Sequence, residues 1–254
     1  MSNNITTSNM RKFNLTMGSM HLLQGVAVLI LSKVFILPIS GSYLAFNKVT
    51  QSLQPTTKVL FNLSLPILIA IFFFLSATAH FVIATVYRKK YEQDLGHGIN
   101  KIRWIEYSIS ASIMMVAISL LVGVYDLFSL IMIFALTGIM NLMGLVMEVH
   151  NQTTKKTNWL SYWIGCVAGT IPWLAIAFYM WLGAVNGSSA PTFVYWIFVS
   201  IFVFFNCFAV NMVLQYKKIG PWKDYLYGER AYIILSLVAK SLLAWQVFAG
   251  TLRP

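Results

Sequence analysis

A lysine and a glutamate lie inside long apolar segments of this sequence, where ionised side chains are costly. Lys240 lies in the apolar run 231–251, and Glu106 lies in the run 99–124. An ionised side chain in mid-bilayer costs about 2.5–3.5 kcal/mol, so both residues are functional candidates if these runs cross a membrane. Burial favours the uncharged amine of a lysine, and such an amine reacts with a carbonyl compound to give a Schiff base. Once protonated, the Schiff base needs a buried anion, for which Glu106 is the deep carboxylate available.

Several titratable residues are predicted to lie in one half of the membrane. At 1.5 Å of rise per helical residue, Lys240 is expected about 15 Å and Glu106 about 10 Å below the same membrane surface. His80 comes to a similar depth, whereas Glu148 and His21 lie closer to that surface. These groups are therefore expected to converge in the half of the bundle nearest the N-terminus.

Two plainer interpretations of the pair stay open. Lys240 and Glu106 could form an interhelical ion pair that only fixes packing. Glu106 could also contact Arg103, one helical turn earlier on the same face. Neither alternative requires a bound carbonyl compound.

The elements that must position these residues are membrane-spanning helices. Apolar residues make up 58% and charged residues 10% of the 254 residues, against about 45–50% and about 25% in soluble domains. Apolar runs of about 18 residues or more predict spanning helices, and we expect one all-α domain over 1–254, a rhodopsin-like bundle of seven such helices. Residues 1–20 are read as a cytoplasmic N-terminal segment, and the spans are expected at about 22–46, 59–87, 99–124, 127–148, 159–184, 192–215 and 231–251.

The distribution of basic residues predicts the orientation of this bundle. Thirteen Lys and Arg residues fall on the N-terminal side of the spans and three on the other, while Lys33 and Lys240 fall within spans. By the positive-inside rule, the N-terminus is cytoplasmic and the C-terminus extracellular in the cell membrane. Membrane topology thus explains the net charge of +11 without nucleic-acid binding. Cys166 and Cys207 lack the spacing of a disulfide framework or a metal site, and Lys33 has no role that we can assign.

Two segments carry a resemblance to a known family. The last predicted span reads ERAYIILSLVAKSLLAWQVFAGTLRP, and the third begins GINKIRWIEYSISAS. With seven spans and an inward N-terminus, the chain resembles the heliorhodopsins, a retinal-binding family inverted relative to other microbial rhodopsins. The resemblance implies that Lys240 carries all-trans retinal as a Schiff base and that Glu106 is its counterion. Ser236, one turn before Lys240, stands where other microbial rhodopsins usually have an aspartate.

The same resemblance implies further site residues. A polar network for the proton is expected from His80, His21, Ser76, Ser236, Asn100, Arg103, Tyr107 and Glu148. The polyene needs a slot with aromatic and flexible apolar walls; the candidates are Met114, Met115, Trp163, Trp173, Phe202, Phe205, Asn206 and Trp245. His21 could instead lie at the lipid interface, and Ser76 and Ser236 could bond to their own helix carbonyls. Any pocket candidate could be ordinary packing or a lipid contact.

The function expected from these features is that of a light sensor or photoswitch, not an enzyme. A pump needs a second deep carboxylate and an exit route for the proton, and the sequence offers neither. A light-driven proton conductor on the same scaffold and a retinal-free structural or ligand-binding membrane protein remain alternatives. Lipid surrounds the chain, and an unidentified downstream protein partner and a homodimer are expected. Gly165 and Gly169 could form the dimer seam or pack within the chain.

Overall fold

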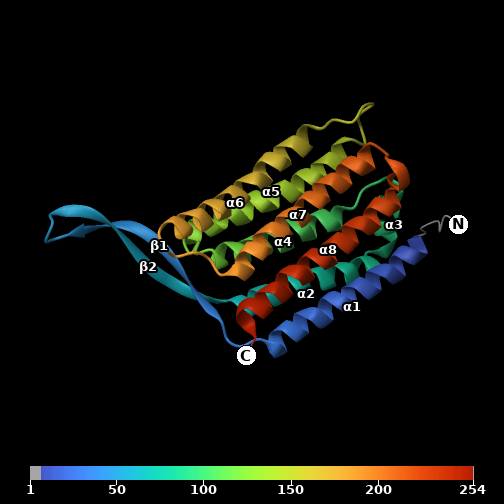
Figure 1. Ribbon diagram of the computed structural model, residues 1–254. Helices are drawn as coiled ribbons and strands as arrows, with labels where there is room; N and C mark the ends of the chain where they lie inside the picture. Colours follow the sequence, from blue (N-terminus) through green and yellow to red (C-terminus); the bar gives the residue numbers. More distant parts are fainter. Residues whose placement is uncertain (1–6, 254) are drawn as a thin grey trace.

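The computed structural model describes residues 7–253 and contains a bundle of long helices (Figure 1). Within those residues, seven helices are long and apolar enough to cross a membrane, as the sequence predicted. The seven helices are α1 (Thr7–Leu31), α2 (Leu65–Ala84), α4 (Lys101–Leu121), α5 (Leu127–His150), α6 (Leu160–Val185), α7 (Thr192–Tyr216) and α8 (Tyr225–Val247), the last continued by a π-helical turn, Phe248–Leu252.

The first two spans differ from their predicted bounds because a β-hairpin lies between them. Strands β1 (Ile36–Asn47) and β2 (Ser52–Ser64) pair antiparallel and extend away from the bundle (Figure 1). The predicted spans 22–46 and 59–87 are therefore wrong at these ends. Hydropathy does not distinguish an apolar strand from an apolar helix, and Pro38 and Gly41 disfavour a helix here. The base of the hairpin is anchored where the Ser40 amide donates to the Tyr125 carbonyl oxygen, at 2.8 Å.

Helix α1 begins earlier than predicted, within the segment read as a polar N-terminal extension. Its contact with α2 explains why polar residues are helical there. A Cβ atom at Gly18 would lie 3.1 Å from the Cβ atom of His80, so the two helices approach closely. Asn14 is completely buried at this contact. Tertiary packing thus extends the helix beyond the apolar run.

Two further elements lie at the end of the bundle where α1 begins, which we call the N-terminal face (Figure 1). The short helix α3 (Arg88–Gly96) joins α2 to α4 in a segment predicted as a loop. Helix α8 begins at Tyr225, ahead of the predicted 231, because Asp224 caps it by accepting a hydrogen bond from the Leu226 amide at 3.0 Å. The first turns of α8 consequently bring polar side chains into the bundle.

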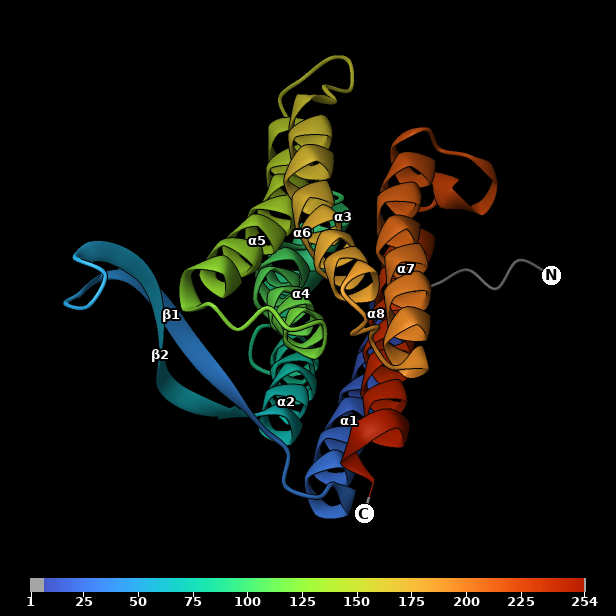
Figure 2. The same ribbon diagram turned by 60° about the vertical axis from the view of Figure 1, so that its left-hand side comes forward.

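The outward faces of the bundle are apolar and fit a lipid environment. Leu174 on α6 and Val203 on α7 are more than half exposed. Gly165 and Gly169, in contrast, face α5, where a Cβ atom at Gly165 would lie 3.2 Å from the Cβ atom of Met143. Of the two interpretations of this glycine pair, the structure shows packing within the chain. Figure 2 shows α5 and α6 side by side, with α7 and α8 forming a separate pair.

Candidate functional site

The predicted lysine and glutamate meet at the centre of the bundle. The Nζ atom of Lys240 on α8 lies 3.3 Å from the Oε1 atom of Glu106 on α4, with side chains only 3% and 8% exposed. Lys240 also donates to the Ser236 hydroxyl at 2.8 Å. Ser76 on α2 donates to Glu106 at 2.6 Å as well as to the carbonyl oxygen of Phe72. Two helices therefore supply one enclosed ion pair, and a third, α2, donates a hydrogen bond to it.

Two histidines lie beside this ion pair at the contact of α1 and α2. The rings of His21 and His80 stack with their centroids 5.5 Å apart. His21 is completely buried, so the alternative that places it at the lipid interface is wrong. Among the described residues, its two ring nitrogens have no hydrogen-bond partner.

Asn14 fixes the tautomer of His80. The Asn14 amide nitrogen donates to the Met10 carbonyl oxygen at 2.9 Å, which orients its Oδ1 atom toward His80. That oxygen lies 2.8 Å from the Nδ1 atom of His80 and can only accept. Neutral His80 therefore carries its hydrogen on Nδ1, and Nε2 is its basic nitrogen.

A second charged cluster lies nearer the N-terminal face. The guanidinium of Arg103 on α4 pairs with both Glu148 on α5 and Glu229 on α8, and all three side chains are buried. Asn100, the N-cap of α4, donates to Glu148 through its backbone amide at 2.9 Å and to Glu229 through its side chain at 2.6 Å. The alternative pairing of Arg103 with Glu106 is therefore not the one that forms.

Aromatic rings enclose the Arg103 guanidinium. Its Cζ atom lies 4.1 Å from the centroid of the Tyr232 ring and 4.7 Å from that of Trp104. Tyr107, predicted for the network, donates its hydroxyl to the Tyr232 carbonyl oxygen at 2.9 Å, and its ring lies 5.2 Å from the Lys240 ammonium. Tyr107 thus separates the ion pair from the Arg103 cluster.

Hydrogen bonds connect His80 to the Arg103 cluster through residues that the sequence did not single out. Asn14 donates to the Tyr91 hydroxyl at 3.3 Å, and Tyr91 donates to Glu229 at 3.4 Å. Burial, and then the Glu229 carboxylate, raise the pKa of the Tyr91 phenol well above its ordinary value, so Tyr91 remains a donor. The missed residues lie outside the predicted spans, and only the ERAYIIL motif, which begins with Glu229, gave a usable signal.

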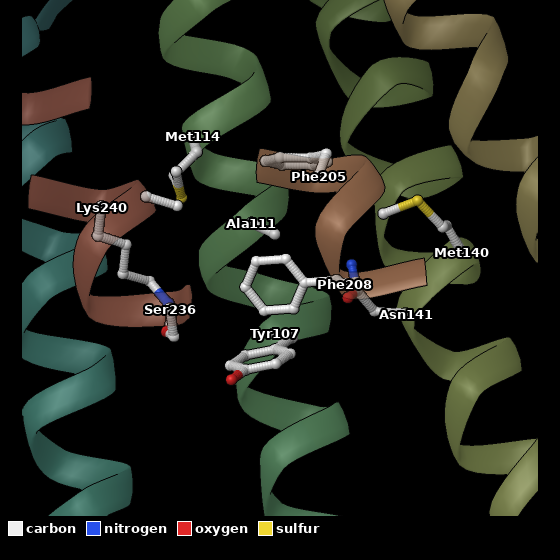
Figure 3. A pocket seen from close by; sticks show the side chains of 10 residues that line it. Tyr107, Ala111, Met114, Met140, Asn141, Phe205, Phe208, Ser236 and Lys240 are labelled. Atoms are coloured by element: carbon white, nitrogen blue, oxygen red, sulfur yellow. Dashed lines mark hydrogen bonds between the residues drawn. The ribbon is translucent and has the colours of Figure 1, made fainter. Parts of the chain in front are cut away.

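A cavity adjoins Lys240 and extends across the bundle (Figure 3). Figure 3 shows Lys240 and Ser236 at one end, Met140 and Asn141 at the other, and aromatic rings between them. A second cavity of about 200 Å³ continues from Met140 and Asn141 between α5, α6 and α7. An amine at one end of an aromatic-walled space provides the chemistry that a linear apolar aldehyde such as retinal requires.

The predicted pocket residues divide between these cavities and other places. Met114 and Phe205 line the first cavity, and Trp173, Phe202, Phe205 and Asn206 line the second. Met115 is buried in the core but lines neither cavity. The prediction is wrong for Trp163, which is 64% exposed because its side of α6 faces outward. Trp245 also lies away from the cavities, where its indole donates to Gln24 at 3.0 Å.

This bundle, with a buried lysine on its last helix, defines a seven-helix membrane protein of the microbial rhodopsin type. The crystal structure of a light-driven proton pump, LR (Mac) from Leptosphaeria maculans, has a TM-score of 0.66 to it at 17% identity, covering 95% of this chain and 94% of that one. The family model for heliorhodopsin matches residues 10–252, so the chain belongs to the heliorhodopsin family. A comparison with curated proteins finds no match. The chain is thus a retinal-binding, light-responsive, multi-pass membrane protein.

Proposed function

We propose that this protein is a photoswitch that pumps no ions, with all-trans retinal on Lys240 as a protonated Schiff base and Glu106 as its counterion. The observation that carries the proposal is the buried 3.3 Å contact between these two side chains at the end of the cavity. Bound retinal supplies the absorption of visible light and the isomerisation of a double bond. The chain supplies the charge balance, the proton acceptor and the enclosure.

The residues around Lys240 are arranged to keep a released proton close by. When the positive nitrogen moves away from Glu106, it loses electrostatic stabilisation and holds its proton less tightly. The Nε2 atom of His80 is the acceptor that we propose, with His21 stacked beside it. A neutral imidazole can accept a proton at its unprotonated ring nitrogen once the donor holds that proton less tightly. The return of the proton to Lys240, together with reversal of the isomerisation, would then restore the dark state.

The placement of the carboxylates favours a switch over a pump. Glu148 and Glu229, two buried carboxylates on the N-terminal side, are both paired with Arg103. Toward the C-terminal face, Asp126 caps α5 by accepting from Ser129 at 2.9 Å and lies at the outer turn. In the part of the chain that the structure describes, α4 and α8 carry no acidic residue beyond the ion pair in that direction. On these two helices, a proton released from Lys240 therefore finds no carboxylate that could accept it on the way to the C-terminal face.

A light-driven proton conductor is the second candidate, and one observation favours it. The hydrogen bonds from His80 through Asn14 and Tyr91 to Glu229 form a connected series directed toward the N-terminal face. If the Arg103 cluster opened, water entering along this polar series could carry a proton to the surface. We place the N-terminal face in the cytoplasm of the cell, in line with its excess of basic residues.

An electrical recording distinguishes these two functions. We expect a purified, reconstituted sample to show a light-induced absorbance cycle, and voltage-clamped cells expressing it to show no stationary photocurrent. The same cells should contain coloured pigment, which shows that the protein is present and that the lack of current is not due to failed expression. A sustained photocurrent that changes sign with the proton gradient would establish the conductor instead.

Replacement of Glu106 by glutamine should shift the visible absorption band to longer wavelength. The carboxylate stabilises the ground state, whose positive charge lies at the nitrogen, more than the excited state, whose charge lies further along the polyene. Glu92→Gln is the matched control, because Glu92 lies on α3 and pairs with Arg88 at 2.7 Å. An unshifted band in Glu106→Gln, measured on the same preparation as the control, would remove Glu106 as the counterion.

We also propose a homodimer and a downstream protein partner. Gly165 and Gly169 pack against α5 within the chain, so they do not supply the dimer seam. The interface must therefore use another surface of the bundle or the hairpin. Light scattering of the purified protein measures the oligomeric state directly.

A further inference from the structure

A hollow of about 230 Å³ lies on the N-terminal face, away from the retinal site. It is bounded by the end of α3, the loop between α5 and α6, the end of α7, and the turn that leads into α8 (Figure 1). One water molecule takes up about 30 Å³ of liquid volume, so the hollow has room for several waters or a small ion.

The charge lining this hollow is positive. Lys218 and Lys223 line it, and no acidic residue does. Within residues 7–253, neither lysine takes part in an ion pair. The adjacent carboxylate, Asp224, is engaged as the cap of α8. Two unpaired ammonium groups beside a concave surface attract anions.

Lys218 occupies a backbone conformation that favours glycine. Its φ is 53°, and it directly follows Lys217, the C-cap of α7. The Ile219 amide donates back to the Leu214 carbonyl oxygen at 3.1 Å, closing the helix end around it. Glycine is the usual residue at such a position because it has no Cβ atom to strain. Because Lys218 holds this strained backbone conformation although it is not glycine, its side chain is expected to have a function.

We propose that this hollow binds a phosphoryl group, which either a free phosphate compound or an anionic lipid headgroup could supply. Phosphoryl oxygens accept charge-assisted hydrogen bonds from lysine, which binds phosphate as a point charge. Lys218 and Lys223 are the principal ligands, and His97, the C-cap of α3, lines the hollow beside them with its Nδ1 atom bonded to the Gln93 carbonyl oxygen at 2.8 Å. Trp222 gives the hollow an aromatic wall, held by the hydrogen bond from its indole to Asn211 at 2.6 Å.

The floor of the hollow is in contact with the Arg103 cluster. Tyr225 lines the hollow and donates its hydroxyl to Glu148 at 3.2 Å. Gln152, which also lines it, donates to the Glu148 carbonyl oxygen at 3.2 Å. An anion in the hollow therefore lies one residue from a carboxylate of the buried cluster. Its binding alters the rate at which the dark state returns, a consequence that rests on the proposed photoswitch.

Calorimetric titration with pyrophosphate in the dark tests the binding step without using the pigment. The native chain, in nanodiscs of phosphatidylcholine at low ionic strength, should bind it saturably. The double variant Lys218→Gly/Lys223→Gln should bind it about tenfold more weakly for each ligand lost. Because glycine relieves the strain at 218, this variant should unfold at no lower temperature than the native chain, so weaker binding would not reflect misfolding.

Lys155→Gln/Lys156→Gln is the matched control, since it removes the same charge from the same face and neither lysine lines the hollow. It should retain nearly native affinity. Three results would overturn the proposal: no saturable binding by the native chain, native affinity in the Lys218→Gly/Lys223→Gln variant, or an equal loss in the control.

The source of the phosphoryl group is decided by repeating the titration in nanodiscs that contain phosphatidylglycerol. Weaker pyrophosphate binding there, in the native chain but not in the double variant, identifies a lipid headgroup as the occupant. Unchanged affinity identifies a free phosphate compound. Both results support a phosphoryl site.

Flash spectroscopy with and without pyrophosphate tests whether anion binding in the hollow changes the rate at which the dark state returns. We expect the anion to change the rate of thermal return several-fold in the native pigment and to have little effect in Tyr225→Phe, which lacks the hydroxyl that reaches Glu148. An unchanged rate of thermal return, together with intact pyrophosphate binding, would overturn only the effect of the anion on that rate. A colourless protein that still binds pyrophosphate would overturn the proposed photoswitch and leave the binding site standing.

Discussion

Lys240→Ala, supplied with all-trans retinal, should form no visible pigment. The amine at the end of the cavity is the group that can form a Schiff base with the aldehyde, and alanine has none. The absorbance of the purified variant checks this directly. In the native protein, hydroxylamine in the light should bleach the visible band by displacing the aldehyde from the lysine.

Lys33→Ala is the control, because Lys33 is the other lysine that hydropathy places within a span. The structure puts it beyond the end of α1, exposed, with its backbone amide bonded to the Leu252 carbonyl oxygen at 2.8 Å. The Lys33→Ala variant should therefore keep the visible absorption band of the native protein. A visible pigment in Lys240→Ala, or its loss in Lys33→Ala, would contradict the assignment; a native chain that never forms pigment would favour the retinal-free alternative.

Arg103→Met should be the most destabilising single change among the polar residues of the site. It leaves Glu148 and Glu229 buried without their common cation. Removing one partner of a buried ion pair costs about 3–5 kcal/mol in the free energy of unfolding. Thermal unfolding of the detergent-solubilised protein, followed by circular dichroism, measures the loss.

Two variants test whether uncompensated buried charge causes the loss of stability expected in Arg103→Met. Arg230→Met removes an exposed guanidinium that lies 5.1 Å from the Phe13 ring centroid, and it should cost at most about 1 kcal/mol. Arg103→Met/Glu148→Gln/Glu229→Gln removes the buried charges together and should recover much of the stability lost in Arg103→Met. If Arg103→Met were as stable as Arg230→Met, the cluster would not be the stabilising centre that its burial implies.

The Lys240–Glu106 pair could be predicted because the cost of burying a charge is visible in the sequence. Each residue stands out against an apolar run, and the rise of a helix converts its position into a depth. The same reasoning placed His80 close to the pair. It could not identify Asn14, whose segment is polar, because hydropathy does not report which polar face a neighbouring helix covers.

The sequence by itself determined seven spanning helices, the family resemblance, and the residues that carry the central ion pair. These features depend on local hydropathy and on the cost of single buried charges. Only the tertiary structure decided that Arg103 pairs with Glu148 and Glu229, which lie 45 and 126 residues away along the chain. It alone also decided that residues 36–47 form a strand. The physical reason is that a charged residue forms an ion pair, and an apolar run forms a strand, only with partners that the folded chain brings beside it.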